Sequence, residues 1–452
     1  MTNKGGKHGV TPNIYFRPAN SKNQMNILLL GSGGREHALA WKITQSKHCT
    51  KLFIAPGNGG TLQYGTNLNF GVNDFEAIKQ CCLYEKIDMV VVGPEDPLVN
   101  GIYDFMVNDV ALKNLIVVGP SKEAAQLEGS KAFSKKFMHR HNIPTASYQE
   151  FTGQNFEEGK AYLQQHSLPI VLKADGLAAG KGVVICQSHE EAIQVFSAMI
   201  IHKQFGEAGS KVVVEEFLAG IEISVFVLTD GKDYKIIGHA KDYKRIGEGD
   251  TGPNTGGMGC VSPVPFADDL FMQKVIGTII EPTIAGLHKE NFTYKGFVFF
   301  GLIKVGEEPF VIEYNCRLGD PETEVVLPRL QNDLVELFLQ MKNGTLKEAT
   351  ILYNQKAAVT VMAVSGGYPG DYEKGKEIFF PEGPDKQEDV LVFHAGTTFN
   401  IANQLITNGG RVITATALSN TIDQAAHLAK DTIAQIDFEG KYYRSDIGYE
   451  FK

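Results

Sequence analysis

Four short apolar runs near the start of the chain constrain its fold most, because a glycine-containing loop follows each of them. Helix-length stretches separate the runs, which are Ile27-Leu30, Leu52-Ala55, Met89-Val92 and Ile116-Val118. This spacing is typical of βαβ units, whose parallel strands are buried on both faces. Loops at the carboxyl ends of such strands form the ligand crevice of an open α/β sheet. We therefore predict a substrate-binding α/β domain over residues 25–130.

The chain has 452 residues, which is too long for one hydrophobic core. Residues 149–218 alternate short strands and two helical stretches, and we expect this small α+β unit to form a lid within a larger domain over residues 131–352. Strand-like runs and one helix indicate a compact, β-rich closing domain over residues 353–452. Residues 1–24 are rich in Gly, Asn, Lys and Pro without periodicity, and we predict a disordered leader there.

Charge and apolar content argue against two classes of partner. The 43 Lys and Arg residues against 52 Asp and Glu give a net charge of -9, and no basic block is present to neutralise a nucleic-acid backbone. The longest apolar run, Ala357-Val364, is far shorter than the roughly 18 residues that a membrane span needs. The N-terminus lacks the apolar core of a signal peptide. We therefore expect a soluble, cytoplasmic protein that binds neither nucleic acid nor a membrane.

The segment GSGGREH, at residues 31–37, follows the first predicted strand and opens a helix. Backbone N–H groups at a helix N-terminus can hold an anion. A dinucleotide fingerprint would need glycine where Glu36 stands, and an acidic residue at the end of the second strand. We favour a small phosphate as the ligand. A nicotinamide dinucleotide and a purely structural tight turn are the alternatives.

The segment KADGLAAGKG, at residues 173–182, places three glycines and two lysines between predicted strands. Loops without bulky side chains let backbone N–H groups approach phosphates, and lysines neutralise them. The segment is not a Walker A motif, because glycine follows Gly-Lys where Ser or Thr is required. We predict that Gly180 and Gly182 help to cradle a phosphate; a glycine hairpin with solvated lysines is the alternative.

Two acids close the apolar strand VVVEEFL at residues 212–218. A strand end beside a cleft can offer backbone N–H and C=O groups to an adenine edge and leave a carboxylate for ribose hydroxyls. Glu222, at the start of the next strand, is the ribose candidate. The alternative is that these acids are solvated strand ends.

The strand FVIEYNCR, at residues 310–317, carries the strongest single signal. A side-chain period of two places Glu313, Asn315 and Arg317 on one face. The opposite face is predicted to enter the core with Phe310, Ile312 and Tyr314. Magnesium chelated by phosphates takes one or two protein oxygens, and a planar cation stabilises charge on a transferred phosphoryl group. An internal salt-bridge row is the alternative.

A long polar loop, DTGPNTGGMG at residues 250–259, lies in an otherwise compact region. Loops of this kind are usually functional or disordered. Its glycines and small polar side chains suit a clamp that orders over a substrate. Asp242, Lys244 and Arg245, just upstream, add charge of both signs.

In this order, the last four segments resemble the ATP-grasp superfamily of carboxylate-amine ligases, and most closely its phosphoribosylamine-glycine ligase family. Matching segments from residue 25 onward are GSGGREHALAW, APGNGGT, VVGPEDPLV, QLEGSKAFSKKFM, KADGLAAGKGV, VEEFLAG, DTGPNTGGMG, IEYNCRLGDPETE, SGGYPGDY, FHAGT, TNGGRV and YRSDIG. The resemblance implies an α/β fold with an N-terminal parallel-sheet, Rossmann-like domain, an ATP-grasp core with a lid subdomain, and a small β-rich C-terminal domain.

The resemblance implies an enzyme of purine biosynthesis that joins glycine to 5-phosphoribosylamine, using ATP and Mg²⁺ or Mn²⁺, through a glycyl phosphate. Its partners would be small molecules, and we expect a monomer. Because the chain ends soon after YRSDIG, a monofunctional, bacterial-type enzyme is implied.

The family's roles carry over to matching positions. Lys131 and Lys173 would hold the ATP phosphates, with Arg317, Lys173 and Asp242 as the catalytic set. Glu313 and Asn315 would bind the metal. The adenine and ribose of ATP would be read by Glu215, Glu216, Phe217, Leu218 and Glu222.

The two remaining substrates should occupy opposite walls. Phosphoribosylamine carries a dianionic phosphate, so we expect it at the helix N-terminus beside Arg35. Glycine is a zwitterion and needs one carboxylate and one cation, for which Asp242 and Arg317 are candidates; a salt bridge from Asp242 to Lys244 or Arg245 is the alternative. Further substrate contacts are expected from Gly33, Gly34, Glu95, Asn254, Gly256 and Gly257.

Overall fold

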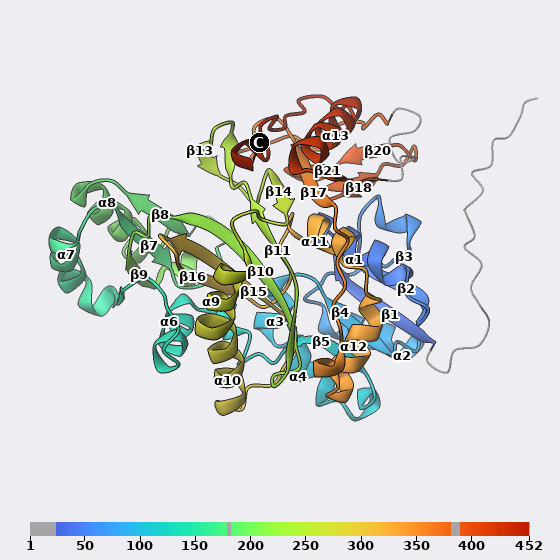
Figure 1. The fold of residues 1–452 in the computed structure, drawn as a ribbon, viewed down its shortest axis with the longest axis horizontal. Coiled ribbons are helices and arrows are strands. Elements are labelled where there is room, and N and C mark those ends of the chain that lie inside the picture. Colours follow the sequence, from blue (N-terminus) through green and yellow to red (C-terminus); the bar gives the residue numbers. More distant parts are fainter. Residues whose placement is uncertain (1–23, 179–181, 381–388, 452) are drawn as a thin grey trace, which may run out of the picture.

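A computed structural model describes residues 24–178, 182–380 and 389–451. In Figure 1 the N-terminal sheet is blue, a separate unit projects at the left edge, and the C-terminal elements lie at the top in red. The predicted disordered leader lies outside the described residues except for Gln24, and so does the predicted loop residue Gly180.

The N-terminal sheet is parallel, as the four apolar runs predicted. Its strands are β1 (Met25–Gly31), β2 (Cys49–Pro56), β3 (Thr66–Asn67), β4 (Met89–Val92) and β5 (Ile116–Pro120). The order is β5-β4-β1-β2-β3, and all neighbours are parallel. The order reverses between β1 and β4, so the loops after these strands face one crevice. The accompanying helices are α1 (Gly34–Thr44), α2 (Phe75–Tyr84), α3 (Glu95–Asn100) and α4 (Ile102–Val107).

The sheet continues without a break into the rest of the chain. Strand β15 (Tyr294–Val305) pairs antiparallel with β5, Tyr294 opposite Pro120 and Lys295 opposite Gly119. From β15 the order runs β10-β11-β14-β17-β21-β18, and β16 also pairs with β15. These strands are β10 (Ile221–Thr229), β11 (Tyr234–Asp242), β14 (Gly259–Ser262), β16 (Glu308–Asn315), β17 (Ala357–Val364), β18 (Val390–His394) and β21 (Arg411–Ser419). One 13-stranded sheet therefore connects the N-terminal and C-terminal parts.

The projecting unit has its own antiparallel sheet, in the order β6-β9-β7-β8. Its elements are β6 (Tyr148–Thr152), α7 (Phe156–Gln165), β7 (Ile170–Ala174), β8 (Val183–Cys186), α8 (His189–Ile200) and β9 (Lys211–Glu216). A separate core that includes Phe151, Phe196 and Val214 holds the two layers together. This unit, which we call the lid, matches the predicted strands and helices, except that β6 was not foreseen.

Other elements surround the sheet. Before the lid come α5 (Gln126–Gly129) and α6 (Lys131–Arg140), and after β16 come α11 (Thr323–Arg329) and α12 (Leu334–Asn343). Two small hairpins are β12 (Arg245–Gly247) with β13 (Thr251–Asn254), and β19 (Thr397–Phe399) with β20 (Leu405–Thr407). The C-terminal helix, α13 (Ile422–Gln435), shares a core with β17 and β21.

One helical segment in the described ranges, Asp269–Lys289, is long and apolar enough to cross a membrane by length and composition. It consists of α9 (Asp269–Val275), a π-helical turn (Ile276–Ile280) and α10 (Glu281–Lys289). Its buried side chains join the same core as β15 and β16. Packing in this fold therefore accounts for its apolar face.

Candidate active site

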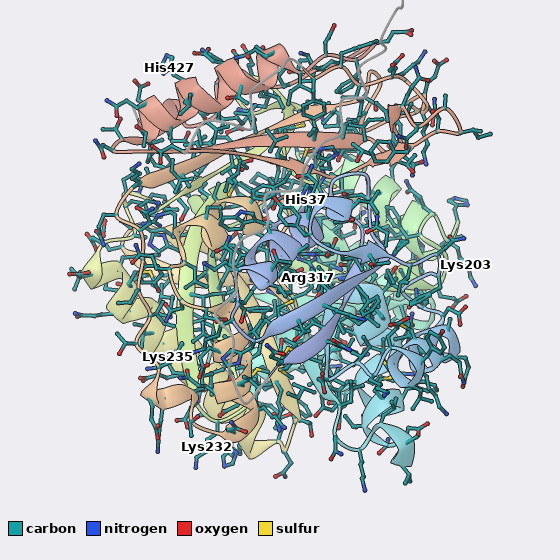
Figure 2. The ribbon with its side chains drawn as sticks, turned by 90° about the vertical axis from the view of Figure 1, so that its right-hand side faces the viewer. His37, Lys203, Lys232, Lys235, Arg317 and His427 are labelled. Atoms are coloured by element: carbon teal, nitrogen blue, oxygen red, sulfur yellow. The ribbon has the colours of Figure 1, made fainter. Side chains whose placement is uncertain are left out.

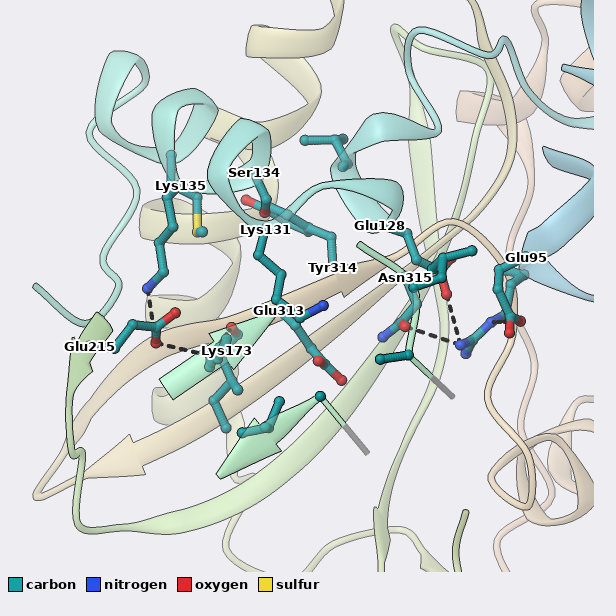
Figure 3. A pocket seen from close by; sticks show the side chains of 18 residues that line it. Glu95, Glu128, Lys131, Ser134, Lys135, Lys173, Glu215, Glu313, Tyr314 and Asn315 are labelled. Carbon is teal, nitrogen blue, oxygen red and sulfur yellow. Dashed lines mark hydrogen bonds and ion pairs between the residues drawn. The ribbon is translucent and has the colours of Figure 1, made fainter. Parts of the chain in front are cut away.

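A cavity lined by Lys131, Lys135 and Lys173 lies between the lid and the central sheet; we call it the lysine cavity (Figure 3). Lys131 and Lys135 are four residues apart on α6, so their side chains leave the same face of the helix. Asp175 fixes the start of α6, because its carboxylate accepts from the Ala132 N–H at 2.7 Å. The loop after β7 is thereby joined to the helix that carries two of the lysines.

One buried carboxylate pairs with two of these lysines. Glu215 Oε2 lies 2.9 Å from Lys173 Nζ and 3.2 Å from Lys135 Nζ. Burial lowers the pKa of Lys135 to about 8, although Glu215 opposes the shift. Lys131 Nζ donates to the Gly176 carbonyl at 3.1 Å. Three lysines with one shared carboxylate between two of them thus lie together on one side of the cavity, where they could bind a polyphosphate.

Strand β16 brings the predicted Glu313 and Asn315 to the cavity wall, and Arg317, two residues after the strand, lines it too. Asn315 Oδ1 accepts from Arg317 Nη2 at 3.1 Å, while its buried Nδ2 has no hydrogen-bond partner in the described ranges. Within the same ranges the Glu313 carboxylate forms no hydrogen bond or ion pair, and no group of three or more His, Cys, Asp or Glu could hold a metal. The pair therefore offers two oxygen ligands, which fits an ion completed by phosphates and water.

The opposite face of β16 differs from the prediction. The pairing with β15 shifts from Gly301 opposite Glu313 to Leu302 opposite Val311, which leaves Ile312 as an extra residue. Such a bulge reverses the inward and outward alternation. Val311 and Tyr314 are therefore the buried core residues, whereas Phe310 is half-buried and Ile312 lines the lysine cavity. The prediction that Phe310 and Ile312 enter the core was wrong.

Two carboxylates fix Arg317. Its Nε lies 3.2 Å from Glu95 Oε2, at the start of α3, and its Nη2 lies 2.8 Å from Glu128 Oε1 on α5. Glu128 also accepts from the Cys316 N–H at 2.6 Å. Burial raises the pKa of Glu128 to about 7 despite Arg317, whereas Arg317 and Arg35 outweigh burial and lower the pKa of Glu95. Figure 2 shows Arg317 near the centre of the molecule, beside the N-terminal strands.

A second opening, which we call the mixed-charge cleft, joins the lysine cavity at Arg317. Its charged lining residues are Arg35, Glu36, Glu95, Asp242, Lys244, Glu313, Arg317, Asp320, Glu322 and Arg411. Glu95, Glu313, Asn315 and Arg317 line both spaces. A nucleotide in the first space and small molecules in the second would therefore meet beside Arg317.

The predicted turn at residues 31–37 lies at this cleft, but carboxylates already occupy part of it. The Gly33 N–H donates to Glu36 at 2.6 Å, and the Arg35 N–H donates to Asp320 at 3.1 Å. Arg35 is 7% exposed, and its guanidinium is held by Glu36 and the Leu318 carbonyl. Gly34 is buried beside these groups. Phosphate binding here stays a prediction.

Asp242 lines the cleft at the end of β11. Burial raises its pKa, although Lys244, with Nζ 3.9 Å from Asp242 Oδ1, opposes the shift. Lys244 lies closer to Glu222, at 2.5 Å, and Arg245 instead donates to the Gly252 carbonyl. The alternative of a salt bridge from Asp242 to Lys244 is thus present in the structure, while Asp242 still faces the cleft.

The other predicted residues are divided between the two spaces and the surface. Gly182 and Glu215 line the lysine cavity, but Glu216, Phe217, Leu218 and Glu222 are not among its lining residues. Glu216 accepts from the Ser147 N–H at 2.7 Å, and Phe217 is exposed.

In the glycine-rich loop, Gly256 lines the mixed-charge cleft and Asn254 is exposed. Gly257 has a positive φ of 119° and adjoins Pro321 and Arg411.

Charged residues of the site that sequence reasoning missed include Glu128, Lys135, Asp320, Glu322 and Arg411. Helical spacing from Lys131 could have found Lys135. Arg411 comes from β21 and forms an ion pair with Asp320 at 3.1 Å, a contact between distant segments that no local pattern encodes.

A cavity with lysines from a lid and a helix on one side, and Glu313 and Asn315 from the central antiparallel sheet on the other, defines an ATP-grasp ligase. The fold agrees with the biotin carboxylase domain of Hydrogenobacter thermophilus 2-oxoglutarate carboxylase, solved with MgADP and bicarbonate (TM-score 0.71, 16% identity, 93% of this chain and 92% of that chain). The chain belongs to the phosphoribosylglycinamide synthetase family. Its N domain matches residues 25–128, its ATP-grasp (A) domain residues 129–323 and its C domain residues 358–450.

Individual relatives agree with this assignment. The chain is 45% identical over 430 residues to the phosphoribosylamine–glycine ligase of Yersinia pestis, covering 94% of this chain and 98% of the relative. It is 46% identical over 430 residues to the corresponding enzyme of Vibrio cholerae, with the same coverage. The crystal structure of phosphoribosylamine–glycine ligase from Thermotoga maritima is similar over 93% of this chain and 99% of that chain, with a TM-score of 0.80 and 36% identity.

Proposed function

We propose that the protein joins glycine to 5-phosphoribosylamine in purine biosynthesis and converts ATP to ADP and phosphate as it does so. The observation that carries the proposal is that Glu95, Glu313, Asn315 and Arg317 line both the lysine cavity and the mixed-charge cleft. A phosphoryl group held in the first space can therefore reach a carboxylate held in the second.

We assign the lysine cavity to ATP. Lys131 and Lys173 hold its phosphates, the backbone at Gly182 approaches them, and Lys135 adds a third cation. Residues 215–218 at the end of β9 read the adenine edge, and Glu222 holds the ribose. Glu222 must release Lys244 to do so, because the two side chains are paired.

Glu313 and Asn315 are the residues that would hold magnesium or manganese. The unpartnered Glu313 carboxylate and the amide oxygen of Asn315 are oxygen donors of the kind these ions prefer. When bound, the ion would neutralise charge on the phosphates of ATP. Arg317, fixed by Glu95 and Glu128, would bind the phosphoryl group in transfer.

The proposed reaction has two balanced steps. A glycine carboxylate oxygen attacks the γ-phosphorus, the bond to the β–γ bridging oxygen breaks, and ADP leaves with that electron pair. The amine of phosphoribosylamine then attacks the carbonyl carbon of glycyl phosphate. Phosphate leaves, the nitrogen loses a proton to solvent, and glycinamide ribonucleotide remains. Phosphorylation is needed because a free carboxylate is a poor electrophile.

We place the two small substrates in the mixed-charge cleft. Glycine would bind between Asp242 and Arg317, and phosphoribosylamine would bind at the turn of Gly33, Gly34 and Arg35, with Glu95 nearby. The segment from Asn254 to Gly257 would form the third wall. We further propose that the enzyme acts as a cytoplasmic monomer with domains at residues 25–130, 131–352 and 353–452.

The test is ADP release with ATP, magnesium, glycine and freshly made phosphoribosylamine, with each omitted in turn. We expect ADP only when glycine is present and glycinamide ribonucleotide only in the complete mixture. ADP release that is unaffected by glycine would contradict the proposal. As a binding control, Mg-ATP should raise the melting temperature, whereas NAD and NADP should not.

A further inference from the structure

The segment YRSDIG near the C-terminus has no role in the site described above, yet it lies against the β12–β13 hairpin. Arg444 is fully buried. Its Nη1 donates to Asp250 Oδ1 at 2.7 Å, in the turn of the hairpin, and to the Arg245 carbonyl at 3.1 Å, in β12. One guanidinium therefore spans the hairpin from its first strand to its turn.

A second acid fixes the guanidinium from the other side. Asp446 accepts from Arg444 Nε and Nη2, both at 2.8 Å, in a bidentate pair. The same carboxylate accepts from the Gly249 N–H at 2.7 Å. The Arg444 guanidinium also lies 5.3 Å from the centre of the Tyr243 ring. Because bidentate pairs restrict direction as well as distance, Arg444 has one orientation in which all of these contacts form.

Neighbouring residues of the C-terminal segment reinforce this contact. Ser445 donates to Glu248 through its hydroxyl at 2.5 Å and its N–H at 3.2 Å. Tyr442 donates to the Ile246 carbonyl at 3.0 Å, and Tyr449 donates to Asp250 at 3.1 Å. The C-terminal segment thus contacts the hairpin along much of its length.

The hairpin leads directly to the wall of the mixed-charge cleft. The Thr255 N–H and hydroxyl both donate to the Lys244 carbonyl, at 2.7 and 2.8 Å, and Lys244, Thr255 and Gly256 line the cleft. Residues 251–254 are exposed. A two-stranded hairpin is marginally stable by itself, so its contacts outside the hairpin decide where this wall lies.

We infer that Arg444 is a positioning residue for the ligase reaction: it holds the β12–β13 hairpin so that Lys244, Thr255 and Gly256 form a fixed wall for the small substrates. The inference rests on the proposed function for the identity of those substrates. The lysine cavity does not include the hairpin. Lys244 connects the hairpin to the proposed ribose residue Glu222, so the effect should be larger at the cleft than at the ATP site.

The test uses the full chain with Arg444→Met and Arg444→Lys. For Arg444→Met we expect amide hydrogen exchange of residues 245–256, measured without substrate, to accelerate about tenfold, because a locally opened hairpin exchanges faster. The KM for glycine or phosphoribosylamine should rise about tenfold while the KM for ATP stays within about twofold. Arg444→Lys keeps the positive charge but loses the bidentate guanidinium. Its exchange rates and KM values should therefore lie between those of the wild type and of Arg444→Met.

A third variant, Asp250→Asn, keeps the inference testable if the Arg444 variants fail to fold. Asp250 is exposed and has a φ of 54°, which asparagine tolerates well. We expect Asp250→Asn to accelerate exchange of residues 245–256 and to raise the KM of the small substrates, each by less than Arg444→Met does. Unchanged exchange of residues 245–256 in these variants would overturn the inference, as would an equal rise of all three KM values or a fall of kcat alone. If exchange accelerates and only the ATP KM rises, the proposed placement of substrates is wrong as well as the inference.

Discussion

The lysine cavity and the mixed-charge cleft adjoin at Arg317 but differ in how their charged side chains are paired. Among the lysines of the cavity, Lys135 and Lys173 share the carboxylate of Glu215, so cationic charge is left there for a ligand. Glu95, Glu128 and Glu313 also line the cavity. In the cleft, each arginine has its own acid: Arg35 pairs with Glu36, Arg317 with Glu95 and Glu128, and Arg411 with Asp320. The first space suits a polyanion. The second suits small molecules that fit among charges already paired, where selectivity matters more than attraction.

The comparison is tested most strongly by altering a residue that lines both the lysine cavity and the mixed-charge cleft. Glu313→Ala should lower kcat by about a thousandfold, because a ligand for the metal and the transferred phosphoryl group is lost. The melting temperature should change little, since the Glu313 carboxylate forms no hydrogen bond in the described ranges and acts on Lys131 only through the attraction of opposite charges. Glu308→Ala, on the same strand but exposed, is the control. Near wild-type turnover of Glu313→Ala at saturating magnesium would disprove the assignment.

The cleft is probed by Asp242→Asn. Removing one charge that faces the glycine ammonium should raise the KM for glycine about tenfold to a hundredfold, and leave that for phosphoribosylamine unchanged. Arg35→Ala should do the reverse. The measurement is initial rate against each substrate in turn. The opposite pattern would show that the substrates occupy the other walls.

The lid is probed by Gly182→Val. A Cβ at Gly182 would lie 2.8 Å from that of Ala178, so the backbone at Gly182 or Ala178 must shift. We expect about tenfold weaker ATP binding in equilibrium titrations, with glycine binding unaffected. Gly153→Ala, in the same lid but with its Cβ in ordinary contact at 3.9 Å from Ile200 Cγ2, should bind ATP normally. Equal losses for ATP and glycine would argue against a phosphate-cradling loop.

The smallest expected effect concerns Glu128 and pH. Because burial raises its pKa to about 7, the folded protein keeps a proton that the unfolded chain releases. Its contribution to stability is therefore full at acidic pH, below the ordinary carboxyl pKa, and is lost as the pH rises through 7. Relative to Glu128→Gln, the wild-type free energy of unfolding should fall by on the order of 1 kcal/mol between about pH 5 and pH 8. Urea unfolding at several pH values measures this, and parallel pH profiles would contradict it.

Sequence patterns were most successful where the information is local. The buried runs of β1, β2, β4 and β5 predicted the parallel sheet, because strands buried on both faces are continuously apolar. The period of two placed Glu313, Asn315 and Arg317 together. The same period predicted the wrong face for Ile312, because the strand has a bulge there. The bulge depends on the pairing with β15, which the local sequence does not specify.

Partners of the charged residues could not be predicted in the same way. Arg317 and Glu128 are 189 positions apart, and Arg411 and Asp320 come from separate domains of the family. Neither contact has a periodic signature. The occupation of the Gly33 and Arg35 N–H groups by Glu36 and Asp320 likewise becomes visible only when the chain is folded.

The pairing of β5 with β15 determines which parts of the enzyme can move. A Cβ at Gly296 would lie only 3.0 Å from the Gly119 nitrogen, so the two backbones are in close contact as well as hydrogen-bonded. A hinge there would break a sheet that runs through the molecule. The lid has its own sheet and its own core, so it can rotate as a rigid body without breaking that sheet. We therefore expect entry and exit of the nucleotide to depend on lid rotation, with the walls of the mixed-charge cleft formed by the long sheet keeping their spacing throughout turnover.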